Sequence, residues 1–262
     1  MAVDLHLHTT ASDGSMTPEK LIKKAVELDY EAIAITDHDT VRGIEPALKT
    51  AYKYSLEVIP GIEINTEYKN HEVHILGYYI DYKHQKLKKS LNYLKEKRKN
   101  RVKKILDRLT NMNIKIKYED IEKISQGGTV GRAHIARAMI NKNYINSWEE
   151  AFEKYIGIGA PAYVRRDKFN PQKTINLIKK IGGIPVLAHP GLINNDDIVK
   201  NIIDMGISGL EVYYYEHSQK EIKKYKKLAN ANNLVTTGGS DDHGPENKDG
   251  LRLGKIRLKY KI

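Results

Sequence analysis

Two histidines near the start of the chain have a spacing that would allow them to bind one metal ion. His6 and His8 lie in or directly after the apolar run Ala2–Leu7. Alternate side chains of a β-strand project to the same face, so the two imidazoles would point together while Leu5 and Leu7 pack behind them. Imidazole is a common ligand of divalent transition metals. A single pair of this kind is more often packed or solvated than metal-bound, so the pair alone does not decide the chemistry.

The same residue types recur where other apolar runs end. The segments are TDHDT (36–40), PGIEI (60–64), HILGY (74–78), AHPG (188–191) and GGSDDHG (238–244). Glu63 lies inside its apolar run, where an unpaired charge would be costly. Histidines and acids thus occur at or beside six of seven expected strands, mostly at the C-terminal ends, where barrel enzymes build their active sites. The repetition favours a metal centre over six separate packing coincidences.

The composition restricts which groups could bind that metal. The chain has 262 residues, of which 40% are hydrophobic and 29% are charged, so it should fold around a core rather than remain disordered. It has no cysteine, which excludes disulfides, thiolate zinc sites, iron–sulfur clusters and cysteine nucleophiles. We expect histidine and carboxylate ligands. The apolar runs are too short to span a bilayer and the first residues do not resemble a signal peptide, so we expect a cytoplasmic protein without a membrane partner.

The net charge of +11 indicates an anionic partner without identifying it. Twelve basic residues and only two acids lie between Lys83 and Arg108. Charge runs are most often solvated helix faces, so solvation and ligand binding both remain open for these lysines.

Short apolar runs alternate with amphipathic segments along most of the chain. The expected strands are Ala2–Leu7, Ala32–Ile35, Val58–Ile64, Val73–Ile80, Ile184–Ala188, Gly209–Val212 and Leu234–Thr237. Such alternation is typical of βα units with a parallel sheet, either a barrel or a doubly wound sheet. From about Lys83 to Val164 apolar residues recur at helical spacing instead. We therefore expect an α/β domain formed by residues 1–82 and 166–262, with a helical insertion over residues 83–165 that caps the substrate.

The motifs, taken in order, resemble the PHP (polymerase and histidinol phosphatase) family of metal-dependent phosphoesterases. The matching segments are DLHLHTTASDG, TDHDT, PGIEI, HILGY, AHP and GSDDHG, and they cover essentially the whole chain. The resemblance implies a distorted (β/α)7 barrel with three divalent metal ions at its C-terminal mouth. It favours Mn²⁺, with Zn²⁺ and Fe²⁺ as alternatives that suit the same ligands.

The resemblance also implies which residues bind the ions. The first ion would be bound by His6, His8, Glu63 and Asp241. The second would share Glu63 and add His74 and His189. The third would be bound by Asp13, His38 and His243. All nine positions carry the expected residue type, which argues against the PHP modules that have lost ligands. Glu63, Asp241 and His243 are the residues we expect to take part most directly in catalysis.

Further segments resemble the bacterial branch of the family that carries a helical insertion. They are GRAHIAR (131–137), AYVRRDK (162–168) and LEVYY (210–214). That branch implies hydrolysis of the 3′-phosphate of nucleoside 3′,5′-bisphosphates by a metal-activated hydroxide, with short 5′-phosphorylated RNA as a further substrate. Two alternatives remain: a phosphatase for another small phosphomonoester such as histidinol phosphate, and a non-catalytic module that binds nucleic acid or a polymerase. The lysine-rich insertion and Asp242, where an aromatic residue is usual, depart from the family pattern.

Several cations outside the ligand set are candidates for binding substrate phosphate. They are Arg101, Arg132, His134, Arg166 and Lys168. Arg132 and His134 begin an expected helix, whose N-terminal amides attract anions. No obligate protein partner is indicated by the sequence.

The remaining polar residues near the motifs have weaker assignments. Asp37, Asp39 and His243 are candidates for protonating the leaving oxygen. We expect His71, His84 and His217 to lie at the surface or beside a ligand. Of Tyr213, Tyr214 and Tyr215, at most one should face the site, and core packing with a hydrogen-bonded hydroxyl is favoured.

Overall fold

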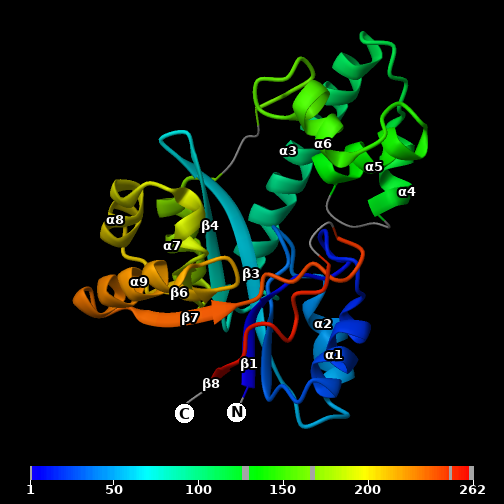
Figure 1. Cartoon of the computed structure of the whole chain (residues 1–262). Helices are drawn as coiled ribbons and strands as arrows, with labels where there is room; N and C mark the ends of the chain where they lie inside the picture. Colours follow the sequence, from blue (N-terminus) through cyan, green and yellow to red (C-terminus); the bar gives the residue numbers. More distant parts are fainter. Residues whose placement is uncertain (1, 126–129, 166–168, 248–249, 260–262) are drawn as a thin grey trace. The chain divides into compact units, whose positions relative to one another are not determined.

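The computed structural model describes residues 2–125, 130–165, 169–247 and 250–259 (Figure 1). The chain divides into two units, one formed by Met1–Lys89 with Lys168–Ile262 and the other by Ser90–Asp167. Within the described ranges, every helix is too short or too polar to span a lipid bilayer.

The strands of the first unit form one sheet in the order β7-β6-β5-β4-β3-β2-β1-β8. They are β1 (Ala2–Leu7), β2 (Ala32–Ile35), β3 (Glu57–Tyr68), β4 (His71–Tyr78), β5 (Ile184–Leu187), β6 (Gly209–Tyr214), β7 (Val235–Gly239) and β8 (Leu258–Lys259). Strands β1 to β7 correspond to the seven that the sequence predicts.

The sheet curls until β1 and the end of β7 meet. The backbone N–H of His8 donates to the carbonyl of Asp242 over 3.0 Å, and Leu7 forms a parallel bridge with the same residue. Gly239 allows this approach, because a Cβ atom there would lie 2.5 Å from the backbone nitrogen of His6. Seven strands therefore make a nearly closed barrel, and the predicted distorted α/β barrel is confirmed.

The prediction of a parallel sheet is wrong for β4, which runs antiparallel to both β3 and β5. The connection from β3 to β4 is only Lys69 and Asn70, with φ angles of 47° and 66°. Two residues with positive φ form a hairpin turn and cannot form the long crossover that parallel strands require. The sequence also gave no indication of β8, a two-residue strand antiparallel to β1.

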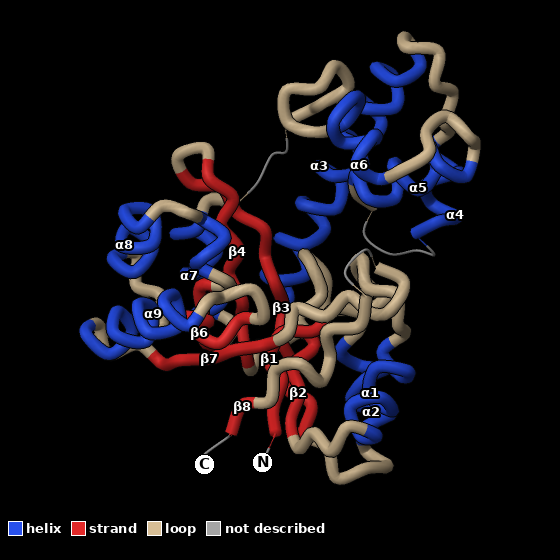
Figure 2. The backbone as a smooth tube through the Cα atoms, in the orientation of Figure 1, coloured by secondary structure: helices blue, strands red, loops and turns tan. Residues whose placement is uncertain are grey.

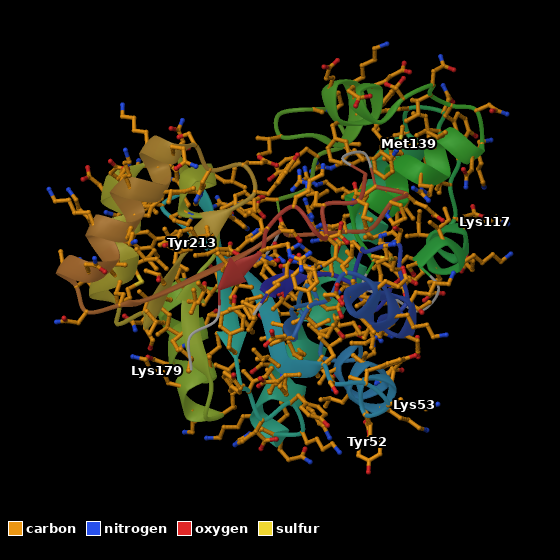
Figure 3. The ribbon with its side chains drawn as sticks, turned by 60° about the horizontal axis from the view of Figure 1, so that its bottom comes forward. Tyr52, Lys53, Lys117, Met139, Lys179 and Tyr213 are labelled. Carbon is orange, nitrogen blue, oxygen red and sulfur yellow. The ribbon has the colours of Figure 1, made fainter. Side chains whose placement is uncertain are left out.

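Within the described residues of this unit, five α-helices and one 3₁₀-helix accompany the strands. Figure 2 shows the strands in red and the helices in blue. They are α1 (Pro18–Glu27), α2 (Ile44–Ala51), α7 (Pro171–Lys180), η2 (Pro190–Ile193, the 3₁₀-helix), α8 (Asp196–Asp204) and α9 (Gln219–Ala231). Local capping explains where two of them begin. Thr17 accepts from the backbone N–H of Lys20, and Ser218 forms a reciprocal capping box with Glu221. Past the end of α2, Tyr52 projects away from the ribbon (Figure 3) and is 92% exposed, as single surface aromatics often are.

Within the described residues of the second unit, the regular elements are all helices, joined by turns and loops. Its elements are α3 (Gln85–Thr110, which begins in the first unit), α4 (Tyr118–Ser125), α5 (Arg132–Asn141), α6 (Trp148–Ala151) and the π-helix η1 (Phe152–Ile156). Ile105, Leu109, Ile121, Ile135 and Met139 are fully buried in a core of its own. The apolar spacing noted in the sequence thus marks the buried face of α3.

Candidate metal centre

His6 and His8 lie on the same face of the barrel, as the alternation of a strand requires. Both side chains are fully buried, and their ring centroids are 5.2 Å apart. Glu63 on β3 and Asp241, directly after the turn that follows β7, supply carboxylates to the same place. The Nε2 atom of His8 lies 3.0 Å from Asp241 Oδ1 and 3.3 Å from Glu63 Oε2. These four residues form one group in which each offers a ligand atom toward the others.

A second group of possible ligands lies on the other side of the His8 ring. It consists of His8, Asp13, His38 and His243. The His8 Nδ1 atom is 3.9 Å from Asp13 Oδ1, and the Nε2 atom of His243 is 3.5 Å from the same oxygen. The rings of His8 and His243 stack with centroids 4.1 Å apart. The structure thus brings His8 to the three residues assigned to the third ion.

Glu63 lies at the centre of the whole cluster because its two oxygens face different histidines. The Oε1 atom is 2.8 Å from His74 Nδ1 and 3.2 Å from His189 Nε2. The Oε2 atom is 2.8 Å from His38 Nδ1. His38, Glu63 and His74 form a third group. The structure therefore brings together all nine side chains that the motifs single out.

The unpaired polar atoms of this cluster test whether the residues suit a metal. Among the described residues, the buried side-chain atoms without a hydrogen-bond partner include His6 Nε2, both ring nitrogens of His8, Glu63 Oε2 and Asp241 Oδ1. Each buried polar atom left in this state costs about 1–3 kcal/mol. A divalent cation satisfies such atoms together, and a set of imidazoles and carboxylates without thiolate suits Mn²⁺, Fe²⁺ or Zn²⁺. The residues present therefore fit a metal centre.

The cluster shifts the protonation of its own members. Burial opposes a charge on His8, but the nearby carboxylates of Asp241 and Glu63 outweigh burial and raise its pKa to about 10. Glu63 raises the pKa of His74 to about 9 in the same way, against burial. The surrounding imidazoles hold the pKa of Glu63 and of Asp241 well below the usual range although burial acts in the opposite direction. Protons on the imidazoles neutralise the carboxylates until a cation displaces them.

Asp37 and Asp39, two candidates for protonating the leaving oxygen, are buried and hydrogen-bonded. Asp37 accepts from the Thr9 backbone N–H over 2.7 Å, from the Thr9 hydroxyl over 2.8 Å and from the Ser12 hydroxyl over 2.6 Å. Asp39 accepts from the backbone N–H of Asn65 over 3.1 Å. These contacts stabilise the loop after β1 and the loop beside β3.

The strand β6 carries functional contacts that the sequence reasoning missed. Glu211 is fully buried and lies 3.0 Å from His6 Nδ1. The Tyr214 hydroxyl donates to Asp241 Oδ2 over 3.1 Å, so one of the three neighbouring tyrosines faces the site, as expected. The signal that could have identified Glu211 is the one used for Glu63, namely an acid inside an apolar strand.

The histidines outside the motifs divide into two kinds. His71 and His84 bond to nearby backbone in turns, at Lys69 and Lys86 respectively. His217 is buried; its Nε2 accepts from the backbone N–H of Gly191, and its Nδ1 bonds to the carbonyl of Val212. It thereby supports the loop that carries His189.

Asp242, which departs from the family pattern, is fully buried and accepts from the backbone N–H of Arg252 over 2.6 Å. This contact ties the C-terminal segment to the loop that carries Asp241.

The candidate substrate-binding cations belong to the second unit as far as they are described. Arg101 donates its Nε–H to the carbonyl of Val164 over 2.7 Å, and its guanidinium lies 5.9 Å from the Tyr163 ring centroid. Arg132 donates to the carbonyl of Ile156 over 3.3 Å and lies 5.8 Å from the same ring. His134 is on the first turn of α5. Arg166 and Lys168 lie outside the described residues.

Comparison with known proteins is consistent with this geometry. The family model described as the PHP domain matches residues 4–164. The 5′-3′ exoribonuclease Rnm of Escherichia coli is 36% identical over 249 residues, which are 92% of this chain and 85% of that protein. The 3′,5′-nucleoside bisphosphate phosphatase of Chromobacterium violaceum is 28% identical over 93% of this chain and 87% of that protein. A solved structure from Bifidobacterium adolescentis is described as a metal-dependent phosphoesterase. It superposes on this chain with a TM-score of 0.86 and 28% sequence identity, and the alignment covers 95% of this chain and 90% of the other.

A nearly closed α/β barrel with a histidine–carboxylate cluster, together with these matches, defines a metal-dependent enzyme that hydrolyses phosphoric esters. The chain belongs to the PHP domain family. The alternative of a non-catalytic module is thereby set aside, since these two relatives, which match more than nine-tenths of the chain, are named as hydrolytic enzymes.

Proposed function

We propose that this chain removes the 3′-phosphate of nucleoside 3′,5′-bisphosphates and also degrades short 5′-phosphorylated oligoribonucleotides. The observation that carries the proposal is the convergence of nine side chains of metal-ligand type. The chain that contains them is similar, over more than nine-tenths of its length, to an exoribonuclease and to a bisphosphate phosphatase.

We assign three divalent ions, with Mn²⁺ as the metal, to the cluster. The first would be held by His6, His8, Glu63 and Asp241. The second would be held by Glu63, His74 and His189. The third would be held by Asp13, His38 and His243, with His8 beside them. When bound, such ions lower the pKa of water and neutralise charge that develops on a phosphoryl group.

The exposure of the cluster supports a proposal for the side from which the substrate would approach. Glu63, His6 and His8 are fully buried, whereas the side chain of Asp13 is 33% exposed and that of His243 is 19% exposed. Phosphate would therefore approach on the side of Asp13 and His243. Burial and the neighbouring His8 oppose a charge on His243, but Asp13 and Asp241 outweigh them and raise its pKa in the metal-free cluster. As an assigned ligand, His243 would release that proton when a metal ion binds.

Glu63 and Asp241 would orient the ligand imidazoles around the reacting phosphate, since each contacts His6 and His8. Together with His243 they form the proposed catalytic set. Arg101, Arg132 and His134, with Arg166 and Lys168, are the proposed binding residues for the second phosphate of the substrate.

The test is phosphate release from adenosine 3′,5′-bisphosphate in the presence of Mn²⁺, beside histidinol phosphate and a short 5′-phosphorylated RNA. We expect conversion of the bisphosphate to the 5′-monophosphate and degradation of the RNA, without turnover of histidinol phosphate. Both activities should be lost in Glu63→Gln and kept in the matched control Glu45→Gln, which lies on the surface of α2. Turnover of histidinol phosphate alone would leave the metal centre in place and reject the substrate assignment.

A further inference from the structure

Neither β6 nor the loop that follows it carries any of the nine assigned metal ligands. Strand β6 nevertheless places Glu211, a fully buried carboxylate, directly behind the ligand cluster. A buried carboxylate is costly unless its oxygens are hydrogen-bonded. The groups that satisfy Glu211 therefore show what this residue does.

Both oxygens of Glu211 face the assigned ligand His6 on β1. The Nδ1 atom of His6 lies 3.0 Å from Oε1 and 3.2 Å from Oε2. Because an ionised carboxylate can only accept, Nδ1 of His6 must carry the hydrogen. The other ring nitrogen, Nε2, is then the atom left for a metal ion, and it lies 3.3 Å from Glu63 Oε2 and 3.4 Å from Asp241 Oδ1.

The same carboxylate also holds the backbone of a second assigned ligand. Glu211 Oε2 accepts from the backbone N–H of His189 over 2.8 Å. His189 has a φ of 25° and precedes Pro190, and a non-glycine residue in that position is strained. This hydrogen bond therefore helps to keep the His189 imidazole 3.2 Å from Glu63 Oε1.

We propose that Glu211 is a positioning residue of the metal centre, which fixes the Nδ1–H tautomer of His6 and the backbone conformation of His189. The inference rests on the proposed metal centre and adds to it a carboxylate that touches two ligands, one on β1 and one in the loop after β5. Carboxylate–histidine–metal arrangements of this kind orient the ring and raise the basicity of the ligating nitrogen.

The first experiment compares Mn²⁺ binding by wild type, Glu211→Gln and Glu216→Gln, measured by calorimetric titration of the full chain. Glu216 is the matched control, because it lies five residues further on and pairs with Arg252 instead of a ligand. Glutamine has one accepting oxygen in place of two and carries no negative charge, so it holds the His6 and His189 N–H groups more weakly. We expect Glu211→Gln to bind Mn²⁺ about 10- to 100-fold more weakly and Glu216→Gln to match wild type. Equal affinity in all three proteins would overturn the proposal.

A second measurement needs no variant at position 211 and decides the question if Glu211→Gln does not fold. In zinc-loaded, ¹⁵N-histidine-labelled wild type, a long-range ¹H–¹⁵N spectrum reports which ring nitrogen of His6 carries hydrogen, with the signal assigned by its loss in His6→Ala. We expect hydrogen on Nδ1 and zinc on Nε2, and the opposite arrangement would reject the positioning role. Failure of wild type to bind either metal would instead reject the metal centre itself, so the two failures are distinguishable.

Discussion

The barrel and the helical unit use their charged side chains in opposite ways. In the barrel, His6, His8 and Glu63 are fully buried and keep polar atoms without hydrogen-bond partners. In the helical unit, Arg101 and Arg132 donate to main-chain carbonyls and lie over the ring of Tyr163. Buried polar atoms without a hydrogen-bond partner reduce stability, and they are retained where a bound ligand or ion supplies the missing partner. The difference therefore marks the barrel cluster as the chemical centre and shows that the arginines also contribute to packing.

The largest expected effect comes from removing a barrel carboxylate. Asp241→Asn should lower kcat by at least about 10²- to 10³-fold, because the charge that holds the centre together is lost. Steady-state phosphate release measures this loss, and a thermal melt establishes that the variant is folded. Full activity in a folded Asp241→Asn protein would contradict the proposed cluster.

The next effect is the pH dependence of metal binding. In the metal-free protein the pKa values of His8 and His74, about 10 and about 9, keep both rings protonated at neutral pH. A metal ion must displace these protons, so raising the pH removes the competition and strengthens binding. The affinity for Mn²⁺ should rise by about tenfold per pH unit for each proton displaced. Calorimetric titrations at pH 6.5, 7.5 and 8.5 test this, and an affinity independent of pH would count against protonated ligands.

A smaller effect on activity is expected for Arg132→Ala, which tests whether an arginine of the helical unit binds substrate or only packs. If Arg132 both binds phosphate and packs, Arg132→Ala should raise KM for the bisphosphate by about tenfold, the equivalent of one charge-assisted hydrogen bond. It should also lower the melting temperature, whereas Arg137→Ala on the same helix should leave KM unchanged. A lower melting temperature with unaltered KM would assign Arg132 to packing alone.

The smallest effect concerns the lysine-rich helix α3. Lys88 and Lys103 are exposed, as solvated charges usually are. The double variant Lys88→Gln/Lys103→Gln should change KM for a short RNA by less than about twofold, since isolated surface charges are screened by salt. A larger increase in KM, together with a shallower salt dependence of binding, would show that this helix contacts RNA.

Local patterns predicted the parts of the fold that depend on short stretches of chain. Short apolar runs between amphipathic segments identified β1 to β7, and helical spacing identified the buried face of α3. The antiparallel direction of β4 was missed because it depends on the turn at Lys69 and Asn70, which lies in a polar segment that resembles a loop. The polar half of β3, from Asn65 to Tyr68, is a strand because it pairs with β4. Such pairing is a property of two segments and is invisible in either one.

The amino-acid sequence by itself determined the chemistry that this protein can perform. Residue types at strand ends specify imidazole and carboxylate ligands. Because successive side chains of a strand point to opposite faces, His6 and His8 lie on the same face. The tertiary structure alone decided which atoms meet. Closure of the barrel places Glu63 between histidines from several strands and brings Glu211 to His6 across 205 positions of the chain. Contacts between residues so far apart are set by how the whole sheet closes, and no local pattern encodes that closure.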